Sequence, residues 1–272
     1  MMLIVDGHCH AGDNWYEPVE MLIHQMDLNG VQKGALIQYR GNYHNRYAME
    51  CAERFPDRLG IVVCIDTDLP DADKTLEDWV KQGAVGVRFA PDTRSPGADP
   101  LAIWRKATQL GIPVTILGRL ELFASPEFRQ LVEDLPDCTI IIEHLAGMYR
   151  NFFPADANYT EEPYTLYTKA MELANFPNTY IKLGGLGEFT ARTPVLPEKF
   201  GFASIPPMID MALEAFGPRR MMWGSDYTPV SSREGYRNAL QGSEDYLSTL
   251  GISQEDKEWI YGKTAMSVWT LP

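Results

Sequence analysis

Leu3-Ile4-Val5-Asp6-Gly7-His8-Cys9-His10 is the first of eight short, mostly apolar runs in this 272-residue chain. Such runs, rich in Val and Ile, are typical of strands that are buried on both faces. A dinucleotide-binding open sheet would carry G-x-G-x-x-G after its first strand, and here Asp6–His10 stands in that place. The first run therefore favours a closed barrel over an open doubly wound sheet. The other seven runs are Gly34–Tyr39, Leu59–Ile65, Ala84–Ala90, Ile112–Leu117, Cys138–His144, Thr179–Leu183 and Met221–Asp226.

Segments with helical spacing and recognisable ends lie between the runs. Pro18–Leu28 has apolar residues at helical spacing, Ser125-Pro126 is an N-cap followed by proline before Phe128–Leu135, and Ser253–Asp256 resembles a capping box. A repeated strand-then-helix order requires parallel strands with helical crossovers. Eight such units match the (β/α)8 or TIM barrel, which typically has about 250 residues. The sequence predicts an α/β fold of this kind, with residues 1–272 in a single domain.

Two connections are longer than the others, near residues 145–167 and 184–203. Both follow the carboxyl ends of predicted strands, and a barrel builds its active site from the loops at those ends. We therefore expect both insertions at the catalytic face, where they would determine substrate specificity.

The composition restricts the class of partner. Twenty-four basic and thirty-seven acidic residues give a formal charge of −13, which disfavours binding to nucleic acid or to an anionic membrane. No stretch approaches the roughly 20 apolar residues of a membrane span, and the N-terminus lacks the basic region of a signal peptide. The four cysteines include no C-x-x-C pair and suit a reducing compartment. We expect a cytoplasmic protein with a small-molecule substrate, and a homo-oligomer is a reasonable prior.

Three of the five histidines and one aspartate fall at the ends of predicted strands. His8 and His10 are two residues apart in the first run, so they project from one face, which we expect Asp6 to share. His144 ends the sixth run and Asp226 ends the eighth. An isolated H-x-H pair or a terminal aspartate is a weak signal, but a rim that combines them is the strongest functional signal in this sequence.

These residues resemble the amidohydrolase superfamily, and within it the amidohydrolase-2 branch of lactonases and non-oxidative decarboxylases. The resemblance covers nearly the whole chain. Besides the H-x-H pair, His144 and Asp226, it is carried by four segments: Gly86–Phe89, Ile142–Gly147, Tyr180–Gly185 and Gly224–Pro229.

The chain departs from the metal-dependent pattern at the fifth strand. Metal-dependent members place a histidine there, whereas Ile112–Arg119 contains no histidine or acidic residue. The fourth run also lacks the lysine or glutamate that bridges two metals, so we expect no binuclear site. Two arrangements stay open. In one, His8, His10 and Asp226 hold a single divalent metal, zinc or manganese, with water as the fourth ligand. In the other, catalysis is metal-free, as in some lactonases of the branch.

The resemblance implies a hydrolase that opens a lactone or related ester of a small carboxylated or sugar-acid substrate. Asp226 would be the general base, and His8, His10 and His144 would polarise the carbonyl. The alternatives are a non-oxidative decarboxylase of an aromatic or unsaturated carboxylic acid and a barrel that binds a metabolite without turning it over.

Four further residues have expected roles. Arg88 would bind a substrate carboxylate or else pair with a carboxylate of the barrel. Tyr149 would close over the substrate, and Lys182 is a weaker candidate for substrate recognition. We expect Glu143 to point away from His144.

Overall fold

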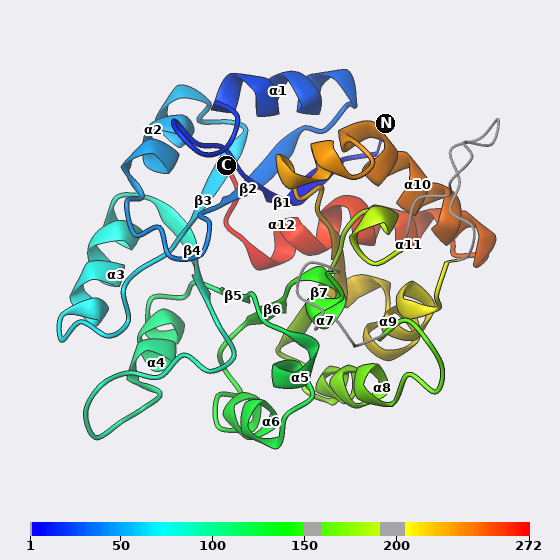
Figure 1. Ribbon diagram of the computed structural model, residues 1–272. Coiled ribbons are helices and arrows are strands. Elements are labelled where there is room, and N and C mark those ends of the chain that lie inside the picture. The colour runs from blue at the N-terminus through cyan, green and yellow to red at the C-terminus, as the bar shows by residue number, and fades with distance from the viewer. Residues whose placement is uncertain (1, 150–158, 191–204) are drawn as a thin grey trace.

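The computed structural model describes residues 2–149, 159–190 and 205–272. Eight strands pair in chain order, each parallel to the next. A bridge between Cys9 and Tyr227 joins the first strand to the chain that follows the last. Helices surround the strands (Figure 1). The predicted single-domain (β/α)8 barrel is confirmed. The strands are β1 (Val5–Cys9), β2 (Lys33–Ile37), β3 (Leu59–Val63), β4 (Ala84–Phe89), β5 (Val114–Ile116), β6 (Ile140–Ile142), β7 (Thr179–Leu183) and β8 (Met221–Trp223).

Helices follow the strands as the pattern predicted, and their capping residues act as expected. The Ser125 hydroxyl accepts a hydrogen bond from the Phe128 amide at 3.1 Å, and Ser253 and Asp256 form a capping box. The helices are α1 (Val19–Leu28), α2 (Arg46–Arg54), α3 (Ala72–Lys81), α4 (Ala102–Gln109), α5 (Leu120–Phe123), α6 (Pro126–Glu133), α7 (His144–Gly147), α8 (Thr165–Met171), α9 (Met208–Phe216), α10 (Tyr236–Thr249), α11 (Gln254–Glu258) and α12 (Thr264–Val268). Shorter turns are η2 (Glu172–Asn175), η3 (Leu186–Glu188), η4 (Pro218–Arg220), η5 (Pro229–Ser232) and η6 (Trp259–Lys263).

Alternate strand residues point into the barrel or outward to the helices. Inside, Val5, Ile37, Val62 and Met222 pack together, and the carboxyl-terminal Trp269 packs with them. Residues between these positions join the larger cluster that the helices cover. Because apolar residues and the carboxyl terminus fill this part of the barrel, its polar interior lies toward the carboxyl ends of the strands.

Asp6 does not share a face with His8, and that prediction is wrong. The register of β1 against β2 shifts between Asp6 and Cys9, which marks an irregularity in the strand. The shift changes the side-chain alternation. Asp6 instead accepts hydrogen bonds from the Ser225 hydroxyl at 2.6 Å and from the Tyr236 hydroxyl at 2.8 Å. Its buried carboxylate thus joins the start of β1 to the segment after β8.

The predicted insertions lie only partly within the described residues. Residues 150–158 and 191–204 fall outside them. The described parts include α7 after β6 and η3 after β7, both at the carboxyl ends of strands. Within the described ranges, no helix is both long enough and apolar enough to cross a membrane.

Candidate active site

The backbone turns sharply at His144 and at Asp226. Both residues have the left-handed backbone conformation, with φ of 50° and 51°, and Leu145 and Ala146 continue this conformation after His144. Non-glycine residues adopt it at a cost of about 1–3 kcal/mol each, and such strain is concentrated at functional sites. His144 comes two residues after β6 and Asp226 three residues after β8, so both side chains lie at the mouth of the barrel.

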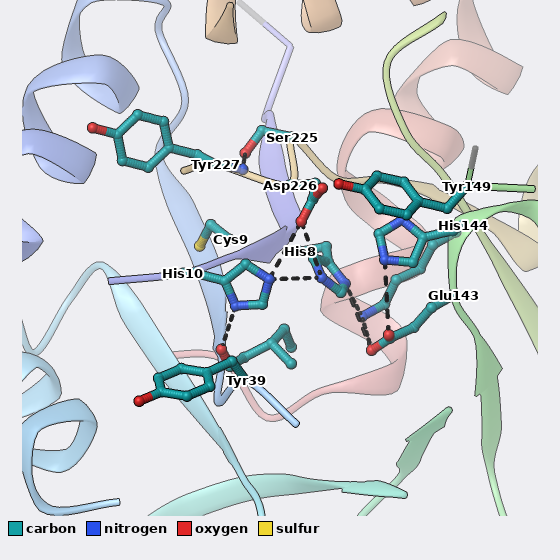
Figure 2. A network of polar contacts seen from close by, with 12 residues as sticks. His8, Cys9, His10, Tyr39, Glu143, His144, Tyr149, Ser225, Asp226 and Tyr227 are labelled. Carbon is teal, nitrogen blue, oxygen red and sulfur yellow. Dashed lines mark hydrogen bonds and ion pairs between the residues drawn. The ribbon is translucent and has the colours of Figure 1, made fainter. Parts of the chain in front are cut away.

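Asp226 meets the H-x-H pair at this mouth (Figure 2). Its Oδ1 lies 3.3 Å from Nε2 of His10 and 3.7 Å from Nε2 of His8. The two Nε2 atoms are 3.1 Å apart, and Nδ1 of His10 lies 2.6 Å from the carbonyl oxygen of Ile37. The backbone supports the arrangement, because the Asp226 amide donates to the His8 carbonyl at 2.8 Å. Cys9, between the histidines, contacts the Ala35 carbonyl through its thiol and belongs to the cluster that the helices cover.

His144 completes the set of residues that the sequence predicted. Its ring centre is 4.9 Å from that of His8, and its Nδ1 lies 3.2 Å from Oε2 of Glu188, a buried residue of η3. Tyr149 lies against it, with ring centres 5.2 Å apart. The structure therefore brings His8, His10, His144 and Asp226 together with Tyr149.

Glu143 points into the barrel, contrary to the prediction. Its Oε2 accepts from Nη2 and Nε of Arg88 at 2.5 and 3.2 Å, and its Oε1 accepts from the Thr115 hydroxyl at 3.0 Å. The prediction failed because it extended strand alternation through His144. Glu143 has extended backbone and keeps the inward position, and the left-handed turn at His144 brings that ring back over the mouth.

Arg88 and Lys182 lie deeper than a simple substrate-binding role requires. Arg88 binds Glu143 through Nε and Nη2, the pair of donors that would otherwise bind a substrate carboxylate, and its Nη1 donates to the Gln38 carbonyl at 3.1 Å. This is the carboxylate pairing that the sequence left open, although Arg88 also lines the cavity described below. Lys182 is 2% exposed and lies 3.1 Å from Nδ1 of His8.

A cavity of about 360 Å³ opens over the site. Its volume is within the roughly 300–1,000 Å³ of small-molecule pockets. Four of its residues are aromatic, so flat apolar walls surround a charged floor. The lining residues are His10, Trp15, Tyr16, Tyr39, Arg40, Arg88, Leu117, His144, Tyr149, Asp226 and Pro229. His8 is absent from this lining and lies beneath His10.

The charges around the floor shift the pKa values of the three central groups. Burial alone would raise the pKa of Asp226, but a hydrogen bond with His10 and the charges of His144 and Arg233 hold it well below its usual value. Burial would lower the pKa of His144, whereas the Glu188 carboxylate raises it. Burial and the neighbouring Lys182 lower the pKa of His8. The site thus favours a carboxylate at Asp226, a cationic His144 and a neutral His8.

The donors fit one divalent metal in type and spacing. Ligand atoms of His8, His144 and Asp226 all lie within 4.8 Å of one another. Glu188 on Nδ1 of His144 is the kind of partner that orients a metal-binding imidazole. This group contains His144 where the sequence-based set contains His10, and His10 lies beside it.

Sequence reasoning missed Arg233 and Glu188. Nη1 of Arg233 donates to Oδ2 of Asp226 at 2.8 Å and to the Tyr149 hydroxyl at 3.2 Å. Its Nη2 lies 3.6 Å from Oε1 of Glu188. Glu188 lies on η3 after β7 and Arg233 follows η5 after β8, so neither lies at a strand end. The only available signal was their position in connections that follow strand C-termini.

The fold is similar to several solved structures. A probable 2-pyrone-4,6-dicarboxylic acid hydrolase from Acinetobacter baumannii, with citric acid bound, is 20% identical at a TM-score of 0.73, covering 98% of this chain and 99% of that one. An amidohydrolase from Burkholderia multivorans with bound zinc is 19% identical at 0.76, covering 99% and 100%. A 5-carboxyvanillate decarboxylase from Sphingomonas paucimobilis is 13% identical at 0.62, covering all of both chains. At these identities the similarity shows the fold alone.

Sequence comparison is more specific. No curated protein matches the chain. The family model described as amidohydrolase, Amidohydro_2, matches residues 6–271, nearly the whole chain. The protein therefore belongs to the amidohydrolase-2 family.

Proposed function

We propose that this protein hydrolyses a lactone, or a related ester, of a small carboxylated or sugar-acid substrate. The observation that carries the proposal is the Asp226 carboxylate, which lines the cavity and lies beside His10 and Arg233. Membership of an enzyme family supports catalysis. A structural neighbour is named for hydrolysis of a 2-pyrone, which is a cyclic ester.

Asp226 would act as the general base. Water attacks the carbonyl carbon and gives its proton to the carboxylate, and a tetrahedral oxyanion forms. When this intermediate collapses, the ring C–O bond breaks, and the proton passes to the leaving oxygen. The low pKa makes the free carboxylate a weak base. A substrate oxygen that accepts a hydrogen bond from His144 or Arg233 would partly neutralise the positive charge that these residues present to Asp226. The pKa of Asp226 would then rise, and its carboxylate would become a stronger base.

His144 would stabilise the oxyanion. Its raised pKa favours the cation, and Nδ1 faces Glu188, so Nε2–H can donate to the carbonyl oxygen. Removal of one such donor commonly costs a factor of about 10² to 10³ in turnover. We therefore expect His144→Ala to lose about two to three decades of kcat.

A metal would supply the same polarisation. If His8, His144 and Asp226 held zinc or manganese, the ion would act as a Lewis acid on the substrate carbonyl. The sequence-based set of His8, His10 and Asp226 is the alternative ligand arrangement.

Arg88 and Tyr149 stay the proposed substrate contacts. Both line the cavity, and Arg40 adds a second guanidinium at its edge. These cations suit a carboxylated substrate, and the aromatic walls suit the faces of a ring. Because Glu143 occupies much of the Arg88 fork, Arg88 contributes mainly positive potential.

The test is acid release from a panel of sugar-acid and unsaturated lactones, followed in a pH-stat. Wild type and Asp245→Asn, an exposed control on α10, should release acid, whereas Asp226→Asn should not. Full activity of Asp226→Asn would overturn the assignment of the base. Carbon dioxide release from hydroxybenzoates, without lactone hydrolysis, would replace the proposal with the decarboxylase alternative. Thermal stabilisation by these compounds without any product would indicate the non-catalytic barrel.

A further inference from the structure

Lys182 is a buried cation that the proposed mechanism does not use. It lies on β7, and its Nζ is 3.1 Å from Nδ1 of His8 and 3.7 Å from Oε1 of Glu143. The Trp269 ring covers it, with Nζ 5.1 Å from the ring centre. Lys182 does not line the cavity, so its direct partner is His8 rather than a substrate.

The contacts of the two histidines leave their ring protons to be assigned. A backbone carbonyl can only accept, so the 2.6 Å contact with Ile37 requires a proton on Nδ1 of His10. The 3.1 Å contact between the Nε2 atoms requires a proton on one of them. Either His8 donates to His10 from Nε2, or a cationic His10 donates to His8. Asp226 favours a proton on His10, because its Oδ1 lies 3.3 Å from Nε2 of His10 and 3.7 Å from Nε2 of His8.

Lys182 favours the first arrangement, in which His8 donates to His10 from Nε2. If His8 accepts at Nε2, its single proton is on Nδ1 and opposes the ammonium at 3.1 Å, with two donors facing each other. If His8 instead donates at Nε2, its Nδ1 lone pair accepts from Lys182. The Glu143 carboxylate lies 3.6 Å from Nδ1, longer than a good hydrogen bond.

We propose that Lys182 is a positioning residue that fixes the proton of His8 on Nε2, and that it thereby weakens metal binding by the H-x-H pair. The hydrogen bonds then run in one direction, from Lys182 to His8, from His8 to His10 and from His10 to Ile37. This inference goes beyond the proposed reaction and does not depend on it.

The consequence for metal follows from the tautomer. An imidazole nitrogen that carries a proton has no lone pair for a metal. To ligate through Nε2, His8 would move its proton to Nδ1, where metal-bound histidines usually donate to a carboxylate or carbonyl. Here Nδ1 faces a lysine, so the usual supporting partner is replaced by a competing donor. The ligand atoms of His8, His144 and Asp226 suit a divalent ion, and Lys182 opposes the binding of that ion at His8.

The experiment compares the protein with Lys182→Met, which removes the donor, and Lys182→Gln, which keeps an N–H donor without the charge. Lys106→Met, in a pair with Glu77 outside the barrel, is the matched control. Nitrogen NMR of protein with ¹⁵N-labelled histidine reports the tautomer of His8, assigned by loss of its signals in His8→Asn. Zinc affinity is measured by competition with a chromophoric chelator, without reference to activity.

We expect the Nε2–H tautomer in wild type, Lys182→Gln and Lys106→Met. In Lys182→Met we expect the Nδ1–H form to appear and zinc affinity to rise by about ten-fold or more, the usual scale for partners of metal ligands. An Nδ1–H tautomer in wild type would overturn the proposal, and that measurement stands even if Lys182→Met fails to fold. Unchanged tautomer and zinc affinity in a folded Lys182→Met would overturn it equally.

Discussion

Arg233, seven residues further along the chain, donates from Nη1 to Oδ2 of Asp226 at 2.8 Å. The opposite oxygen of the same carboxylate faces His8 of β1 and His10, which follows the strand. The base is thus fixed between a loop cation and the first strand. A side chain held at both oxygens keeps one orientation, which a general base requires for efficient proton transfer.

Arg233→Met should weaken catalysis and change its pH dependence. The guanidinium lowers the pKa of Asp226, so its loss raises that pKa, and the carboxylate becomes protonated at a higher pH. The acid limb of kcat/KM should therefore move to higher pH. In Arg233→Met the Asp226 carboxylate becomes a stronger base, but it loses the hydrogen bond that orients it, worth about 1.5–3 kcal/mol. We expect the loss of orientation to outweigh the gain in basicity, so kcat/KM should fall by roughly ten- to a hundred-fold. Pre-steady-state and steady-state rates across the pH range check this, and an unmoved acid limb would contradict it.

Glu188→Gln should shift the other limb. Glu188 raises the pKa of His144, so the neutral amide allows that pKa to fall. His144 then loses its proton at a lower pH, and the basic limb of kcat/KM should move down. Glu172→Gln, an exposed residue that pairs with Arg129, is the control and should leave the profile unchanged. A basic limb that stays in place in Glu188→Gln would remove His144 from the proposed oxyanion role.

The regular part of this structure could be predicted from the sequence. Continuous Val- and Ile-rich runs identified all eight strands, and local hydrogen-bonding residues such as Ser125 and Ser253 marked helix starts. These signals depend on short-range periodicity and capping, which act within a few residues. They also placed His8, His10, His144 and Asp226 at one rim, because parallel strands end on the same side.

The errors occur where the backbone leaves regular geometry. The register shift in β1 separates Asp6 from His8, and the left-handed turn at His144 reverses the alternation on which the prediction for Glu143 rested. Arg233 and Glu188 reach the site from irregular loops, whose paths depend on tertiary packing. Sequence periodicity carries no information about such turns, so Arg233 and Glu188 could not be placed in advance.

Arg88→Met should destabilise the fold strongly. The Arg88–Glu143 pair is buried, with Nη2 and Oε2 2.5 Å apart, so removal of one partner leaves a buried charge that is only partly compensated. Breaking such a pair typically costs about 3–5 kcal/mol. Urea unfolding should show this loss, whereas Arg129→Met, which removes an exposed pair, should leave the midpoint unchanged. A midpoint within error of wild type would mean that Lys182 and Thr115 suffice to stabilise the Glu143 carboxylate.

The stability that Glu143 contributes should disappear in acid. Burial would raise the pKa of Glu143, but Arg88 and Lys182 lower it from 4.5 to about 2 in the folded state. A carboxyl group whose pKa is lower in the folded state stabilises the fold at pH values above its pKa in the unfolded state. This contribution is lost as the pH falls through the pKa in the folded state. The Glu143→Gln variant has no ionisable group at this position, so it lacks this contribution to stability at every pH. The difference in unfolding free energy between wild type and Glu143→Gln should therefore be constant above about pH 5 and shrink between pH 4.5 and 2. Urea titrations at several pH values measure it, and a difference that does not change with pH would show that folding does not lower the pKa of Glu143.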